Sequence, residues 1–379
     1  MRAGPGQTVA GRYQVTDRPQ SPAGPGEQRF AVDGRTGAQV VLEALELPEL
    51  LAPELYATGP EDAPEASRWL DPGRIVAAVA AVIEGCPEHP RLRQAFEAVA
   101  QEGMVWIAVE LPPAVELSAL LADGPLPPYR VAELAADLAG ALRALHTAGQ
   151  VHGNLGPHTV LVCEDGAALL GGQALAAAEE ALAGSLAGPD GRRRVEVRAG
   201  VVGARAERWA PELLAGPDQA GPAADCWALG VLLHRLLTGR GPFPEQTPTA
   251  LFAAVRSGRP AGTEGCGPLR PLVDLLLAAD PAARPDAQAV QRWLCDLLAT
   301  APEPYAAAAE PEVLPVLRPS WPLVPRQRRS TAVVGVEHAR HAKQRGDGRQ
   351  PSKLLPVLLV GGVLLVMLGA LTAVVLLAH

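Results

Sequence analysis

Short apolar runs separated by turn-forming residues dominate the first part of the chain. The runs at 13–15, 30–32 and 40–42 are separated by segments rich in Gly, Pro or polar residues. Apolar stretches of this length, bounded by turn formers, are typical of strands in an antiparallel sheet. A longer apolar run at 105–110 predicts a buried strand. The pattern therefore predicts an antiparallel sheet, and residues 1–11 read as a flexible leader before it.

A helical period follows in two places. Residues 73–86 predict one helix and residues 128–148 predict another, longer one. In the longer stretch, apolar residues recur at intervals of three and four, which indicates an amphipathic helix. Those residues are Val131, Leu134, Ala135, Leu138, Ala141, Leu142 and Leu145. Residues 164–166 then predict a turn between two short strands, the first of which is at 160–162.

The end of the chain has a different pattern. Residues 300–353 are Pro-rich and then basic, without sustained periodicity, and predict a linker. Residues 354–378 contain no charged side chain. About 20 apolar residues span a bilayer core as a helix, so we expect a transmembrane helix here. Within it, Gly369 and Ala373 form a small-xxx-small pair that can support a homodimer through this helix.

Composition and charge narrow the class of protein. The chain has 379 residues, enough for about two or three domains, and a formal net charge of −8, which does not suggest a nucleic-acid partner. Its five cysteines are widely spaced without a Cys-x-x-Cys pair, so neither a zinc site nor a disulfide framework is expected. Lysine is nearly absent while Ala, Gly, Pro and Arg are frequent, which is typical of high-GC bacterial coding.

Basic residues before the apolar segment predict its orientation. They are Arg326, Arg328, Arg329, Arg340, Lys343, Arg345, Arg349 and Lys353. Only Glu337 and Asp347 oppose them. Basic residues next to a membrane span stay on the cytoplasmic side. We therefore expect a single-pass protein of the cell membrane whose main domain is cytoplasmic and whose C-terminus is at the outer face.

One motif stands at the centre of the chain. Residues 151–162 read Val-His-Gly-Asn-Leu-Gly-Pro-His-Thr-Val-Leu-Val. This segment resembles the catalytic loop of the protein kinase family, His-Arg-Asp-Leu-Lys-Pro-x-Asn followed by an apolar strand. His152 and Pro157 match that pattern. Asn154 stands at the position of the catalytic Asp, and Thr159 at that of a metal-binding Asn.

Later motifs follow in the same order as in that family. Residues 208–212 resemble its Ala-Pro-Glu motif, 225–230 its Asp-x-Trp-x-x-Gly helix start, and 280–285 its Asp-Pro-x-x-Arg-Pro. The chain is thus similar to bacterial Ser/Thr protein kinases. The resemblance implies an α+β fold of two lobes, with a small antiparallel-sheet lobe at 12–111 and a larger, mainly helical lobe at 112–299.

The resemblance also implies roles for three structural residues. Asp225 should bond the backbone of the His152 loop, and its position suggests a helix N-cap as well. Glu212 should form an ion pair with Arg284. These residues brace the fold and take no part in the reaction.

The residues that would carry the chemistry are replaced. Glu43 stands where the family has the Lys that grips nucleotide phosphates, and no lysine occurs before Lys343. The Gly-rich phosphate loop keeps only Gly24 and Gly26, and the metal-binding Asp of Asp-Phe-Gly is Gly172. Phosphoryl transfer depends on cations around the phosphates, held metal ions and a carboxylate base, all of which these positions lack.

These observations favour a membrane-anchored, catalytically impaired kinase-like protein. We expect it to act as a cytoplasmic signalling scaffold or binding module for an unknown cytoplasmic protein partner, with no cofactor and no metal. Two alternatives stay open: a divergent active Ser/Thr kinase that uses ATP and Mg²⁺, and a nucleotide-binding switch without transfer. The basic cluster at 192–194 predicts an exposed loop that could also dock an acidic partner.

Overall fold

The structure is a computed structural model that describes residues 4–18, 27–48, 70–187, 194–215, 221–244 and 247–301. The chain divides into two units, 1–324 and 325–379, and all described residues belong to the first. Gly24, Gly26, the predicted transmembrane helix and almost all of the predicted linker lie outside them. Among the helices that are described, none is long and apolar enough to cross a membrane.

The first lobe contains a six-stranded antiparallel sheet in the order β1-β2-β3-β4-β6-β5. Its strands are β1 (Thr8–Val9), β2 (Tyr13–Val15), β3 (Glu27–Asp33), β4 (Gln39–Glu46), β5 (Ala95–Gln101) and β6 (Met104–Glu110). The predicted strands are all present. The flexible leader expected over 1–11 is wrong for its second half, because β1 pairs with β2 through Thr8 and Val9.

The strand β4 is central and buried on both of its faces. Val40, Leu42 and Ala44 join one apolar cluster on one face. Val41 joins a second cluster, formed with helix α2 (Pro72–Gly85), on the other face. Side chains alternate across a strand, so Glu43 shares the face of Val41. The sequence thus places a carboxylate on the inner face of the sheet.

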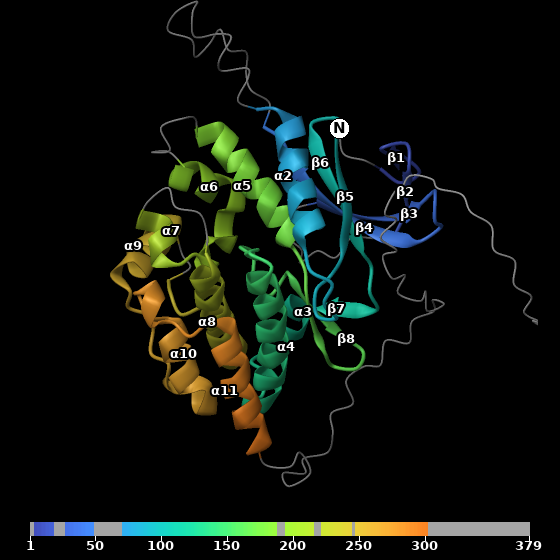
Figure 1. The fold of residues 1–379 in the computed structure, drawn as a ribbon. Coiled ribbons are helices and arrows are strands. Elements are labelled where there is room, and N and C mark those ends of the chain that lie inside the picture. The colour runs from blue at the N-terminus through green and yellow to red at the C-terminus, as the bar shows by residue number, and fades with distance from the viewer. Residues whose placement is uncertain are drawn as a thin grey trace, which may run out of the picture. The chain divides into compact units, whose positions relative to one another are not determined.

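The second lobe is mainly helical (Figure 1). Its helices are α3 (Leu117–Leu121), α4 (Pro128–Thr147), α5 (Gln173–Ala187), α6 (Arg194–Val202), α7 (Pro211–Ala215), α8 (Pro222–Thr238), α9 (Pro248–Ser257), α10 (Arg270–Leu276) and α11 (Ala287–Ala299). Short 3-10 turns are η2 (Gly203–Arg208), η3 (Glu264–Leu269) and η4 (Pro281–Ala283). A small sheet in the order β7-β8-β9 joins β7 (Ala114–Glu116), which precedes α3 in sequence, to β8 (Val160–Cys163) and β9 (Ala168–Leu170), which lie between α4 and α5.

The helix α4 confirms the amphipathic pattern, because its regularly spaced apolar residues are buried. It packs against α8 and α11 and delivers the chain to the loop at His152. The helix α8 begins at Pro222 with Gly221 as its N-cap. The N-cap role predicted for Asp225 is therefore wrong: Asp225 lies in the first turn of α8 and its carboxylate is used elsewhere.

Candidate functional site

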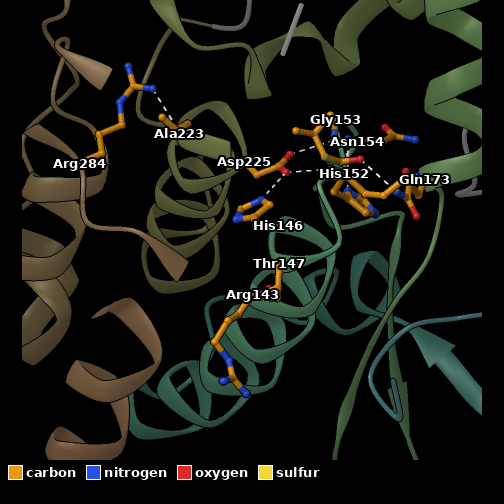
Figure 2. A network of polar contacts seen from close by, with 12 residues as sticks. Arg143, His146, Thr147, His152, Gly153, Asn154, Gln173, Ala223, Asp225 and Arg284 are labelled. Atoms are coloured by element: carbon orange, nitrogen blue, oxygen red, sulfur yellow. Dashed lines mark hydrogen bonds and ion pairs between the residues drawn. The ribbon is translucent and has the colours of Figure 1, made fainter. Parts of the chain in front are cut away.

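The carboxylate of Asp225 holds the central loop in place (Figure 2). Its Oδ2 accepts a hydrogen bond of 2.8 Å from the backbone N–H of His152, and its Oδ1 accepts one of 2.8 Å from Gly153. The Nε2 of His146, on α4, lies 2.9 Å from Oδ2. Gly153 has φ of +69°, a left-handed conformation that favours glycine. The contact that the resemblance implied for Asp225 is thus present.

His152 is buried and ties the loop to the end of β9. Its Nδ1 lies 3.2 Å from the backbone N–H of Asn154, which donates to it. The proton of the neutral ring must therefore sit on Nε2, which donates to the Gly171 carbonyl at 2.9 Å. Burial lowers the pKa of His152 to about 4. The ring is neutral at physiological pH and its contacts are structural.

Asn154, Thr159 and Gly172, which the resemblance places at the catalytic-base and metal positions, contact one another. The amide Nδ2 of Asn154 donates to the Gly172 carbonyl at 3.0 Å, and Thr159 Oγ1 donates to the Asn154 carbonyl at 2.7 Å. Gly172 has φ of +87°, and a Cβ added to it would lie 2.7 Å from Thr159 Cγ2 and 3.1 Å from Asn154 Nδ2. The space that a side chain at position 172 would need is already filled.

Metal ligands are not gathered at this site. Within the described parts of the chain, no three His, Cys, Asp or Glu residues are grouped so that they could hold a metal ion. Asp165 lies in the turn between β8 and β9, where its Oδ1 accepts a hydrogen bond from the N–H of Ala167 at 2.9 Å. Its carboxylate is therefore engaged in the turn that the sequence predicted.

Glu43 is buried and pairs with an arginine that sequence reasoning missed. Its Oε1 lies 2.8 Å from Nη1 of Arg93, and the two side chains are 6% and 9% exposed. The Nε of Arg93 also donates to the Glu110 carbonyl at 2.7 Å. Burial raises the pKa of Glu43, and Arg93 opposes that rise. The only signal for Arg93 in the sequence is physical, since a carboxylate on a central strand needs a buried cation.

The segment after Gly172 forms helix α5, which the sequence analysis did not predict. It follows β9 after only Gly171 and Gly172. Ala174, Leu175, Ala178 and Leu182 join the apolar cluster on the inner face of the sheet. The Ala- and Leu-rich composition of 174–187 could have indicated it, because these residues are strong helix formers. Arg192 and Arg193 of the predicted basic loop lie outside the described residues, and position 194 begins α6.

The ion pair expected between Glu212 and Arg284 is present in the large lobe. Arg284 Nη1 lies 2.7 Å from Glu212 Oε1, and Nη2 lies 2.9 Å from Oε2. The Arg284 side chain is fully buried, while Glu212 is 28% exposed. Arg284 also donates to the carbonyls of Ala223, Ala278 and Ala279. The pair joins α7 to the segment before α11.

Comparison with known proteins agrees with this architecture. Residues 77–293 match the protein kinase domain family, which is more than half of the chain. The chain belongs to the protein kinase family. Its fold is accordingly kinase-like, with a sheet-bearing small lobe and a helical large lobe.

Relatives within the family include bacterial serine/threonine-protein kinases. Pkn2 of Myxococcus xanthus is 27% identical over 298 residues, which is 77% of this chain and 32% of that protein. PknL of Mycobacterium tuberculosis is 28% identical over 215 residues, 56% of this chain and 49% of that protein. Tribbles homolog 3 of Mus musculus is 43% identical over 76 residues, 20% of this chain and 22% of that protein. The chain thus spans less than half of the length of these relatives.

Proposed function

We propose that this chain is a catalytically impaired member of the protein kinase family that acts as a signalling scaffold or binding module at a membrane. One observation carries the proposal: Asn154, Thr159 and Gly172, which stand at the catalytic-base and metal positions, fill the space between one another. An amide cannot accept the hydroxyl proton as a carboxylate does. Neither Thr159 nor Gly172 offers a carboxylate to a metal.

The environment of Glu43 supports the same proposal. Phosphate groups are bound by cations, and a carboxylate at the phosphate-gripping position repels them. Arg93 is the nearby cation, but its guanidinium is engaged by Glu43 and the Glu110 carbonyl. A nucleotide would have to displace a buried ion pair to reach it, which costs several kcal/mol in order of magnitude.

The test of inactivity is a transfer assay on the full-length chain. Radiolabelled ATP and Mg²⁺ should give no label on the chain itself or on a generic protein substrate. Asn154→Asp should stay inactive too, because metal and phosphate binding would still be missing. Glu133→Gln, at an exposed position of α4, is the control for expression and purification of a variant. Label that appears with the natural chain and disappears with Asn154→Ala would overturn the proposal.

A thermal shift assay distinguishes a chain that binds nucleotide without transferring phosphate from a chain that binds no nucleotide. A ligand at a hundred times its Kd stabilises the folded state by about 2.7 kcal/mol, which raises the melting temperature measurably. We expect no shift with ATP, with or without Mg²⁺. A clear rise without label transfer would favour a nucleotide-binding switch and would contradict the scaffold proposal in its present form.

The location and partner belong to the same proposal. The apolar segment 354–378 and the basic residues before it support a single-pass anchor with the kinase-like domain on the cytoplasmic side. The partner is then a cytoplasmic protein, and Gly369 and Ala373 could support a homodimer within the membrane. Cofactors are not needed for such a role.

A further inference from the structure

The helix α5 has the environment of a core helix. Each of its 15 residues is buried or half-buried, and none is exposed. It packs against α2, β4 and β6 of the small lobe and against α6 of the large lobe (Figure 1). A helix without an exposed residue belongs to the interior of a protein rather than to a mobile surface segment. Because α5 starts directly after Gly172, this interior position lies beside the replaced catalytic positions.

A buried ion pair joins α5 to the 3-10 turn η2. Glu179 is 2% exposed and its Oε2 lies 3.6 Å from Nη2 of Arg208, whose side chain is 6% exposed. The Nε of Arg208 donates to the Gly153 carbonyl at 3.1 Å. The N–H of Gly153 is in turn held by Asp225. A continuous series of polar contacts therefore runs from α5 through the central loop to α8.

The first residue of α5 makes a second polar attachment. The Nε2 of Gln173 lies 3.0 Å from the carbonyl of Val151 and 3.2 Å from Oε1 of Gln150, and it donates to both (Figure 2 shows Gln173 beside the loop). The helix is thus attached to the segment around the central loop both at its start and in its middle. Its apolar side is attached to the sheet through Ala174, Leu175 and Leu182.

We infer that α5 fixes the two lobes in one arrangement, and that the Glu179–Arg208 ion pair holds α5 in place. Any hinge motion of the sheet relative to the large lobe would uncover the apolar side of α5 or break a buried ion pair, and both are costly. The lobes therefore keep one arrangement, and a binding partner meets a preformed surface. Whatever breaks the Glu179–Arg208 pair releases α5. This inference rests on geometry and holds whether or not the chain transfers phosphate.

Hydrogen exchange read by mass spectrometry on the full-length chain tests whether α5 is held in place between the lobes. Amides of α5 should exchange as slowly as those of the core helices α4 and α8, because they open only when the domain unfolds. Fast exchange of α5 in the natural chain, similar to that of a surface helix, would overturn the inference. This comparison needs no variant, so it stands even where a substitution prevents folding.

Variants test the role of the Glu179–Arg208 ion pair. Arg208→Leu removes this cation from the buried Glu179, so exchange in α5 and α2 should rise on the order of a hundredfold while α11 stays protected. The double variant Glu179→Leu/Arg208→Leu should regain part of the lost protection of α5 from exchange. Arg74→Ala, an exposed arginine on the neighbouring helix α2, is the matched control and should change nothing. If α5 stays as protected in Arg208→Leu as in the natural chain, or if the double variant regains no protection, the ion pair does not hold α5 in place.

Discussion

At the scale of single residues, three buried acids of the described residues are matched by arginines that are distant in sequence. Glu43 pairs with Arg93 and Glu179 with Arg208. Asp33 accepts hydrogen bonds of 2.7 and 2.8 Å from Arg12, which hold the pKa of Asp33 well below its usual range. With no lysine before Lys343, every long basic side chain in the domain is an arginine, whose planar fork suits such two-point contacts.

The Glu212–Arg284 pair is the most direct residue-scale test. Arg284→Ala removes a fully buried guanidinium that serves Glu212 and three backbone carbonyls. Breaking a buried pair costs roughly 3–5 kcal/mol, and partial exposure of Glu212 places the expected loss near the lower figure. Urea unfolding of the full-length chain should show this decrease in the free energy of unfolding. Arg270→Ala, at a half-exposed arginine, should change it little, and equal effects of the two variants would refute the expectation.

At the scale of elements, the loop at 151–159 is held by its backbone. Asp225 binds two of its N–H groups, and the ring of His152 bridges it to Gly171. Asn154 and Thr159 add contacts within the loop and to Gly172. A loop with this many internal contacts keeps its shape without a ligand, which agrees with the proposed scaffold role.

The burial of His152 predicts a pH dependence for this loop. Its folded-state pKa of about 4 lies below the ordinary value of 6.5, so the unfolded chain takes up a proton first as the pH falls. The stability that neutral His152 contributes is fully present above pH 6.5 and is lost as the pH falls towards 4. The slope of this contribution is about 1.4 kcal/mol per pH unit.

Unfolding curves measured between pH 7.5 and 4.5 test this prediction. His152→Asn should flatten the pH dependence by about one proton relative to the natural chain. His158→Gln, at a half-buried histidine of the same loop, serves as the matched control. Identical slopes for the natural chain and His152→Asn would show that His152 does not cause the loss.

At the scale of the whole molecule, the kinase-like domain is followed by a basic segment and an apolar one. Full-length protein should therefore sediment with membranes and resist a carbonate wash, whereas a chain truncated after residue 353 should be soluble. In intact spheroplasts, a tag at the N-terminus should survive added protease if the domain lies on the cytoplasmic side, as we propose. Soluble full-length protein would overturn the anchor, and digestion of the tag without lysis would overturn the orientation.

Much of the fold could be predicted because it depends on local pattern. The strands around Tyr13, Val41 and Ile107, and helix α4, follow from apolar spacing within a few residues. The predictions that were wrong concern features that depend on neighbouring elements. The strand β1 is only two residues long and exists because β2 offers it a partner. Asp225 has the residue type of an N-cap, but Pro222 starts the helix three residues earlier.

By itself, the sequence determined which chemical groups stand at the positions that the resemblance equates with the catalytic ones. An amide at 154, a hydroxyl at 159, a glycine at 172 and a carboxylate at 43 are local facts, and their chemistry does not depend on packing. Only the tertiary structure decided what surrounds these groups. It brought Arg93 to Glu43 and Arg208 to Glu179, and it buried α5 beside Gly172. Such contacts depend on which surfaces meet across many residues of chain, and no spacing rule connects their members in advance.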